Sequence, residues 1–247
     1  CQRKRMSNGI IYGVGVGPGD PELISLKAYN LLKKAKHIAY FKKKDKEGIS
    51  YKIIKEYLRK DVLEIKMNYP ITTEISFLSS QYKKTLSQFY DNCCNEILTI
   101  SNQNKDLVII CEGDPFFYGS FMHIYTRLLN KNIIKVIPGI TGMSAAWTAS
   151  KSPITWGDDV LTVIMGTMTE NEIVKRIKKN DAIVIMKIGK NYEKICKVLK
   201  SLNLFNDAFL VENASMSNER VRKLTDVHEL TLPYFSIILL HGTGRRP

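Results

Sequence analysis

Short apolar, β-branched runs alternate with longer amphipathic segments along most of this chain of 247 residues. The segments between the runs, such as 21–36 and 80–100, carry apolar residues at helical spacing. Alternation of strand and helix predicts an α/β fold built on parallel or mixed sheets. The nine candidate strands are residues 10–14, 38–41, 62–66, 107–111, 133–137, 160–165, 182–186, 209–212 and 235–240.

Nine strands are many for one sheet in a chain of this length, so we expect two domains. We place them at residues 8–116 and 117–242, joined near residues 113–121. The basic residues 1–5 are followed by no apolar stretch and predict no secretory signal. They and the tail 243–247 can be additions to a native chain that starts at Met6.

The lengths of the apolar runs and the spacing of the cysteines argue against a membrane-spanning, zinc-binding or disulfide-rich protein. The longest apolar run, near residues 234–240, is interrupted by Ser236 and falls far below the ~20 residues of a membrane-spanning helix. The five cysteines form no CxxC pair and lie at no ligand spacing from a histidine, which argues against a zinc site or a disulfide framework. We therefore expect a cytoplasmic protein that holds no metal and binds no membrane.

The formal charge of +13 favours a polyanionic partner: nucleic acid, an anionic membrane, or a small molecule with many carboxylates. A general richness in lysine, asparagine and isoleucine explains the surplus equally well. Nucleic-acid binding is disfavoured, because basic residues are not interleaved with aromatic ones and no binding motif occurs.

A glycine-rich segment, Gly13-Val-Gly-Val-Gly-Pro-Gly-Asp-Pro21, follows the first candidate strand and leads into a helix expected to begin near Pro21. Such a turn lets the backbone approach a ligand closely. A G-x-G-x-x-G motif would need glycine at Pro18 or Asp20, and no Lys-Ser/Thr pair follows as in a P-loop. Dinucleotide or nucleoside-triphosphate binding is therefore a weak interpretation.

Two further segments place small residues after a strand: Cys-Glu-Gly-Asp-Pro-Phe-Phe-Tyr-Gly at 111–119 and Ile-Pro-Gly-Ile-Thr-Gly-Met-Ser-Ala-Ala at 137–146. Strand ends in α/β sheets are where ligands bind. Asp114 can offer its carboxylate to a ligand, or it can act as an ordinary helix cap. The small residues of 142–146 can admit a bulky ligand or serve close packing alone.

Together and in this order, the three segments resemble the signature loops of the tetrapyrrole methylases, namely GxGPGDP, GDP-F-x-x-G and PGIT/S. The resemblance runs from about residue 10 to residue 240. It implies two α/β domains, each a mixed sheet flanked by helices, with S-adenosylmethionine in a cleft between them, and usually a homodimer. The positions that match cofactor-binding residues of the family are Pro18, Glu112, Gly113, Asp114, Phe117, Thr141, Gly142, Met186 and Ala214. For Met186 and Ala214, plain core packing is an equal alternative.

Residues 69–74 and 111–122 resemble most closely the branch that methylates carbon 20 of precorrin-2, or of its cobalt form, in cobalamin biosynthesis. The branch acting on uroporphyrinogen III ends its second strand in Tyr-Asp, whereas Phe41 stands in that place here. Its reaction is therefore not assigned. A methylase of the same family that acts on another corrinoid carbon, or on a substrate that is not a tetrapyrrole, is the alternative.

A substrate rich in carboxylates would suit the positive charge. Lys42, Lys43 and Lys44 are candidate carboxylate ligands, with a solvated loop as the alternative, and Glu74 is a further candidate substrate contact. No residue is assigned as catalytic. Candidates for a general base are Glu74, Glu112, Tyr40 and Tyr118.

Overall fold

The computed structural model describes residues 8–71 and 79–246. The chain divides into two compact units, Cys1–Thr141 and Gly142–Pro247. This division lies later than the boundary expected between residues 116 and 117, because β5 (Ile134–Ile137) pairs with β1 (Ile11–Gly15) in the sheet of the first unit.

The first unit contains a five-stranded sheet in the order β3-β2-β4-β1-β5. All of its pairings are parallel, so this sheet is more uniform than the mixed sheet expected from the sequence. Its remaining strands are β2 (His37–Lys43), β3 (Leu63–Tyr69) and β4 (Leu107–Cys111). Its helices are η1 (Pro21–Leu23), α1 (Leu26–Leu32), α2 (Ile49–Ile54), η2 (Lys55–Tyr57), α3 (Ser80–Ser101) and α4 (Phe121–Leu128).

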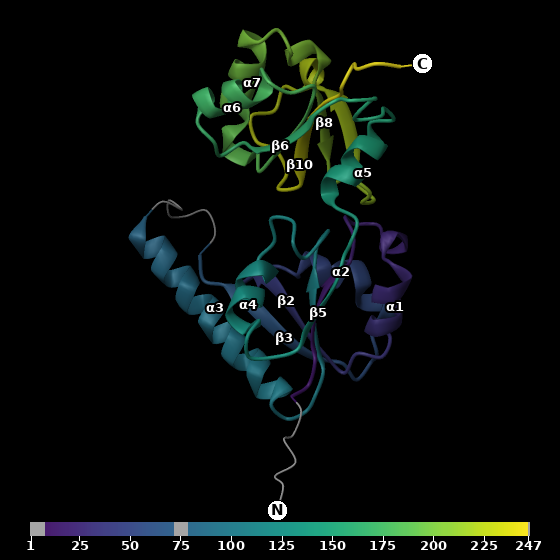
Figure 1. Cartoon of the computed structure of the whole chain (residues 1–247), viewed down its shortest axis with the longest axis vertical. Coiled ribbons are helices and arrows are strands. Elements are labelled where there is room, and N and C mark those ends of the chain that lie inside the picture. The colour runs from purple at the N-terminus through teal and green to yellow at the C-terminus, as the bar shows by residue number, and fades with distance from the viewer. Residues whose placement is uncertain (1–7, 72–78, 247) are drawn as a thin grey trace, which may run out of the picture. The chain divides into compact units, whose positions relative to one another are not determined.

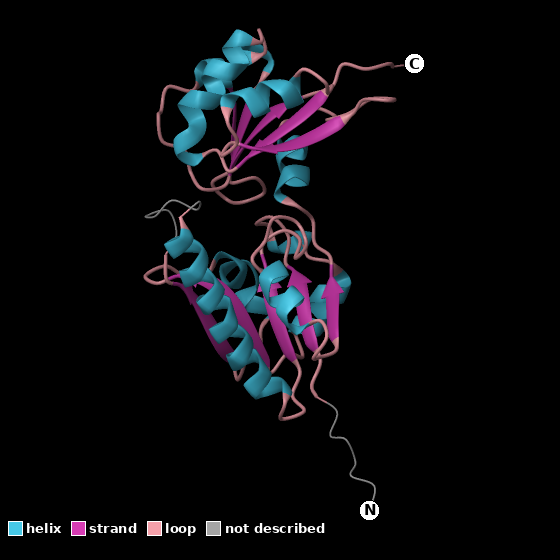
Figure 2. Ribbon diagram, turned by 60° about the vertical axis from the view of Figure 1, so that its left-hand side comes forward, coloured by secondary structure: helices cyan, strands magenta, loops and turns pink. Residues whose placement is uncertain are grey.

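Helices cover both faces of this sheet (Figure 1). Along β4, Leu107 and Ile109 face a buried cluster with α3 and α4, whereas Val108 and Ile110 face a second cluster with α1 and α2. The near-continuous apolar sequence of β4 therefore reflects burial on both sides, as is typical of parallel sheets. The long helix α3 runs across one face in Figure 2.

The segment predicted as one helix over 21–36 is divided into two. The Asp20 carboxylate accepts the backbone N–H of Glu22 and starts η1, and the Ser25 hydroxyl then accepts the N–H of Ala28 and starts α1. Each short polar side chain supplies the cap that a helix start requires. The two consecutive caps explain why the helical pattern is interrupted.

The second unit contains a five-stranded sheet in the order β6-β7-β10-β8-β9. Only β6 and β7 pair in parallel, and the other pairings are antiparallel. Its strands are β6 (Leu161–Met165), β7 (Ala182–Met186), β8 (Phe209–Glu212), β9 (Arg220–Lys223) and β10 (Ser236–Leu240). The sequence did not predict β9, because its Arg-Val-Arg-Lys composition carries little of the apolar signal of a strand.

The helices of the second unit also cover both faces of their sheet. They are α5 (Gly142–Ala149), α6 (Glu170–Ile177), η3 (Gly189–Asn191), α7 (Tyr192–Ser201), η4 (Phe205–Asp207) and η5 (Leu224–Asp226). Buried residues of α6 and α7 form one cluster, and those of α5 belong to another. Within residues 8–71 and 79–246, no helix is long and apolar enough to cross a membrane.

Candidate functional site

The carboxyl ends of β4 and β1 form the best candidate site of the first unit. The two strands are neighbours in the sheet, but the chain leaves β1 toward the face covered by α1 and leaves β4 toward the face covered by α4. Loops that diverge in this way leave a crevice at the strand ends, where open α/β sheets bind their ligands. The three glycine-rich segments follow β4, β1 and β5, which are consecutive strands of this sheet, and they therefore meet at this edge.

Glycines allow the three loops to contact one another through their backbones. A Cβ atom on Gly15 would lie 2.5 Å from the Gly113 carbonyl oxygen and 2.6 Å from the Gly139 nitrogen. The Gly113 N–H donates to the Gly17 carbonyl at 2.8 Å, and both residues have a positive φ, +62° and +82°. Left-handed backbone is accessible to glycine without a steric penalty, so this junction depends on glycine.

The carboxylate of Asp114 connects two of these loops. Its Oδ1 accepts the backbone N–H of Phe116 at 2.8 Å, and its Oδ2 accepts the N–H of Gly139 at 3.0 Å. The sequence predicted that this carboxylate either contacts a ligand or caps a helix, and in the structure both of its oxygens have backbone partners. A carboxylate oxygen can accept a second hydrogen bond, so the geometry leaves room for a ligand donor as well.

Glu112 acts as a helix cap from outside the helix. Its Oε1 accepts the backbone N–H of Ser50, in the first turn of α2, at 2.9 Å. The residue that precedes this helix, Gly48, has no side chain to supply a cap. Burial raises the pKa of Glu112, and the hydrogen bond from Ser50 opposes that shift. Sequence reasoning missed Ser50, because the contact spans 62 positions.

The same edge carries exposed apolar side chains. Phe116, Tyr118 and Ile140 are 47%, 46% and 41% exposed. The ring of Phe117 meets Tyr118 edge-on at 4.8 Å, and Tyr118 has a φ of +54° that is uncommon for a residue other than glycine. Pro18, by contrast, is buried. Backbone polar groups beside apolar surface suit a small ligand with both flat apolar and polar parts.

The candidate residues of the second unit lie at the carboxyl ends of strands. Met186 ends β7 and Ala214 follows β8, and because both strands run antiparallel to β10, these ends share one edge of the sheet. Met186 packs against the buried cluster that contains Ala214. Lys187, Asn213 and Ser215 beside them all have positive φ. Strained backbone of this kind is concentrated at ligand sites. Together with the position of Met186 and Ala214 at strand ends, it indicates a ligand site at this edge of the sheet. Thr141 ends the first unit, and Gly142 starts α5.

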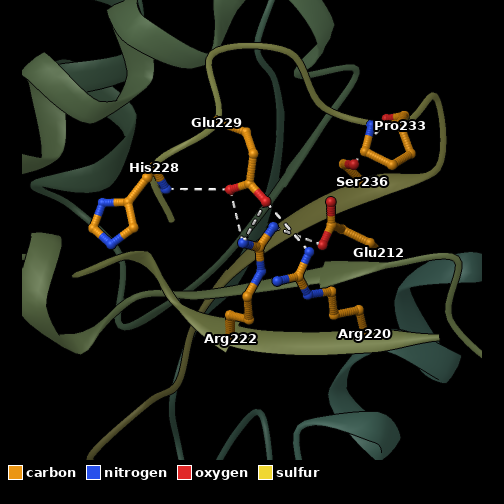
Figure 3. A network of polar contacts seen from close by, with 7 residues as sticks. All are labelled: Glu212, Arg220, Arg222, His228, Glu229, Pro233 and Ser236. Carbon is orange, nitrogen blue, oxygen red and sulfur yellow. Dashed lines mark hydrogen bonds and ion pairs between the residues drawn. The ribbon is translucent and has the colours of Figure 1, made fainter. Parts of the chain in front are cut away.

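A network of charges holds this edge of the second sheet (Figure 3). The Arg222 guanidinium donates to Glu212 at 2.9 Å and to both oxygens of Glu229 at 2.9 and 2.8 Å. The side chains of Arg222 and Glu212 are only 11% and 6% exposed, so the pair is largely removed from water. The network fixes the end of β8, which leads directly into the turn at Ala214.

The structure separates the three lysines predicted to bind carboxylates. Lys42 and Lys43 belong to β2, where neighbouring residues point to opposite faces, and the Lys42 amine donates to the Lys44 carbonyl at 3.0 Å. Glu74 lies outside the described residues. Lys43 and Lys44 line an open pocket of about 610 Å³. Its other lining residues are Asp45, Lys46, Asn68, Tyr69, Pro70 and Ile71.

Tyr40 is poorly placed for a general base. Its ring is buried and stacks on Tyr51, and its hydroxyl donates to Glu64 at 2.7 Å. Burial first, and then the Glu64 carboxylate, raise the pKa of Tyr40 far above its ordinary value. The neighbouring Phe41 points to the opposite face and stacks on Tyr69 at 5.5 Å.

Comparisons with known proteins agree with this geometry. The family model of tetrapyrrole (corrin/porphyrin) methylases matches residues 10–230. The chain is 38% identical over 239 residues to a precorrin-2 C(20)-methyltransferase of a Sinorhizobium species, covering 97% of this chain and 98% of that protein. It is 30% identical over 213 residues to a Methanocaldococcus jannaschii protein named "Probable cobalt-precorrin-2 C(20)-methyltransferase", covering 85% of each. Among solved structures, uroporphyrin-III C-methyl transferase from Thermus thermophilus, complexed with S-adenyl homocysteine, has a TM-score of 0.62 at 22% identity, covering 94% of this chain and 97% of that chain.

Proposed function

Because the chain belongs to the tetrapyrrole (corrin/porphyrin) methylases, we propose that it transfers a methyl group from S-adenosylmethionine to carbon 20 of precorrin-2 or cobalt-precorrin-2, in cobalamin biosynthesis. The observation that carries the proposal is the match, along nearly the full length of both chains, to a precorrin-2 C(20)-methyltransferase. The glycine-rich edge at the switch point of the first sheet supports a methylase of this family.

The residues at this edge suit S-adenosylmethionine. Gly113 and Gly139 bring bare backbone to the ends of β4 and β5, and Phe117 supplies a flat apolar side chain beside them. When bound, the cofactor supplies a methyl group activated by a positively charged sulfur. We propose the same cofactor role for Pro18, Glu112, Asp114, Thr141, Gly142, Met186 and Ala214.

The protein's part in such a transfer is alignment of the acceptor carbon and exclusion of water. The bonded loops hold their backbone in one geometry before any ligand arrives, which reduces the cost of ordering the site. Carbon 20 gains a methyl group and afterwards loses a proton. Among the described candidates for the group that accepts this proton, we retain Tyr118, because its side chain is 46% exposed at the glycine-rich edge and a substrate can reach it there.

The decisive experiment incubates the protein without oxygen with precorrin-2, and separately with cobalt-precorrin-2, using S-adenosylmethionine labelled with carbon-13 in its methyl group. We expect one labelled methyl group at carbon 20 by mass spectrometry and NMR. Comparison of kcat/KM for the two acceptors tells whether the natural substrate contains cobalt. Label at another ring carbon, or transfer only to a substrate that is not a tetrapyrrole, would favour the alternative within the same family.

A homodimer and a cytoplasmic location belong to the same proposal. The described cysteines Cys93, Cys94, Cys111 and Cys196 are all free thiols, as suits a reducing compartment. Light scattering coupled to size-exclusion chromatography measures the oligomeric state. A mass equal to one chain would contradict the dimer and leave the proposed reaction unaffected.

A further inference from the structure

His123 lies at the end of α4 that is nearest the glycine-rich edge. The helix starts at Phe121, directly after the loop that follows β4, and His123 belongs to its first turn. The hydroxyl of Ser120, one residue before the helix, contacts Tyr69, the last residue of β3. This turn is therefore near the carboxyl ends of β3 and β4, the edge at which a parallel sheet binds its ligands.

Tyr90 fixes the orientation of the His123 ring. The two rings stack at 4.4 Å with an angle of 26° between their planes. Tyr90 comes from α3 and is buried, and its hydroxyl donates to Ser120 Oγ at 3.2 Å. Arg127 lies over the Tyr90 ring at 5.5 Å and donates to the His123 carbonyl oxygen at 3.1 Å. These contacts hold the imidazole in one place before a substrate binds.

The nitrogens of the His123 ring are not used by the fold. The hydrogen bonds that His123 accepts from Thr126 and Arg127 both go to its backbone carbonyl. Among the residues that the structure describes, none bonds to a ring nitrogen of His123, and His123 is exposed. His241 is the opposite case, because its Nε2 is bonded to Ser150 at 2.9 Å. The His123 ring therefore offers a nitrogen lone pair to a substrate.

The surroundings of His123 keep its imidazole neutral at pH 7. Partial burial first, and then the positive charge of Arg127, lower the pKa of His123 below its ordinary value of 6.5. Arg127 is itself paired with Asp91 at 2.8 Å. The other titratable side chains around this cluster are Tyr82, Tyr90, Cys93 and Cys94 of α3 and Tyr69 of β3. A neutral imidazole accepts a proton directly, whereas a phenol must first lose its own.

We propose that His123, rather than Tyr118, accepts the proton that carbon 20 loses after methyl transfer. Tyr90 and Arg127 are positioning residues. The inference rests on the proposed function, because only a methylated tetrapyrrole carries this proton. The bond between the methyl group and sulfur breaks as the bond to carbon 20 forms, and its electron pair stays on sulfur. The carbon 20–hydrogen bond then breaks, its electron pair returns to the conjugated macrocycle, and the proton passes to a His123 nitrogen and on to water.

The first test compares methyl transfer to precorrin-2 by the wild type and by His123→Gln. We expect kcat to fall about 100-fold, the usual contribution of a general base, with little change in the KM of either substrate. Added imidazole should restore part of the activity of His123→Ala. His228→Gln replaces an exposed histidine of the second unit and is the matched control. A larger loss of kcat in Tyr118→Phe than in His123→Gln would overturn the inference.

The second test measures the pKa of His123 in the protein without substrate, by NMR of a chain with carbon-13 in its histidines. Wild-type kcat/KM should rise with pH through that pKa, because a protonated imidazole cannot accept a proton. Arg127→Gln removes the positive charge and leaves Asp91 without its partner, so the NMR pKa and the rise in kcat/KM should both move to higher pH. A pKa that moves without the rise in kcat/KM would overturn the inference.

Calorimetric titration of S-adenosylhomocysteine separates a chemical role from general damage, and we expect the same affinity in the wild type and in His123→Gln. A parallel loss of kcat and of this affinity would overturn the inference, as would an unchanged kcat, and wild-type turnover would leave the proposed function standing. A wild type that methylates neither precorrin-2 nor cobalt-precorrin-2 would contradict the proposed function and the inference with it. Methylation at another ring carbon would contradict carbon 20 alone, and the same variants would then decide on His123.

Discussion

The carboxylate of Asp114 accepts the backbone N–H of Gly139 at 3.0 Å and so joins the loop after β4 to the loop after β5. The other carboxylate oxygen accepts the N–H of Phe116 within its own loop. One side chain thus holds two of the three glycine-rich loops in register. Its first role is in the geometry of the site, before any contact with a ligand.

Replacing Asp114 with alanine should therefore reduce both stability and cofactor affinity. Two backbone N–H groups lose their acceptors, and we expect the free energy of unfolding to fall by about 1–3 kcal/mol. Urea unfolding and calorimetric titration of S-adenosylhomocysteine measure the two effects. Asp61→Ala, which removes an exposed carboxylate, is the control. Weaker ligand binding at unchanged stability would show that Asp114 is only a ligand contact.

The junction of the loops predicts unequal tolerance of two glycines. A Cβ at Gly139 would overlap the Gly113 carbonyl, whereas a Cβ at Gly119 would lie 3.6 Å from the Pro115 carbonyl oxygen, an ordinary contact. Gly139→Ala should lower the free energy of unfolding by about 1–3 kcal/mol or more, the usual cost of overpacking. Gly119→Ala should change it little. Equal thermal stability of the two variants would contradict close packing of the loops.

Much of this architecture follows from local sequence, because apolar runs bounded by turn residues define strands well. β4, β7 and β8 begin and end where the sequence predicts. The exceptions have physical causes. β9 is a charged edge strand held by Arg222 and its partners, and Asp20 and Ser25 divide one helical pattern between two caps.

The candidate site was only partly predictable. Its position followed from the resemblance of three loops, but the partners of each side chain depend on contacts between distant parts of the chain. The bond between Glu112 and Ser50 is of this kind, as is the meeting of Tyr69 with Ser120. The Ser120 hydroxyl makes no hydrogen bond to the first turn of α4, which Ser120 precedes, and no local pattern predicts that it bonds Tyr69 instead.

Lysines beside the open pocket should make substrate binding sensitive to salt. Changing Lys43 and Lys44 to glutamine should raise the KM of the tetrapyrrole and flatten its dependence on ionic strength. The physical reason is screening, because the Debye length falls from ~10 Å at 0.1 M to ~3 Å at 1 M. Lys33→Gln with Lys34→Gln, an equal charge change on exposed residues after α1, is the control. An unchanged salt dependence would exclude the two lysines as substrate ligands.

The charge network of the second unit predicts unequal effects of its two ends. Arg222→Met leaves Glu212 buried without its cation and should cost about 3–5 kcal/mol of unfolding free energy. Glu229→Gln, at the exposed end, should have a much smaller effect, because water solvates what remains. Guanidinium unfolding of both variants measures the difference. Equal losses would mean that the network acts as one unit.

Glu112 gives a prediction about pH. Burial raises its pKa above the ordinary value of 4.5, so its contribution to stability is present below pH ~4.5 and is lost as the pH rises through the folded-state pKa. Glu112→Gln keeps an acceptor for the Ser50 N–H but cannot ionise, so its stability relative to the wild type should increase as the pH rises from about 4 to 8. Glu172 is the opposite case, because its hydrogen bonds with Thr169 lower its pKa, and the wild type should gain over Glu172→Gln as the pH rises through the same carboxyl range. Urea unfolding across this range measures both trends.

The activity of Glu112→Gln then tests whether the carboxylate has a chemical role. If methyl transfer persists in this variant, Glu112 is a helix cap and not the base. If methyl transfer is lost while the cap and the stability trend remain, the carboxylate has a chemical role.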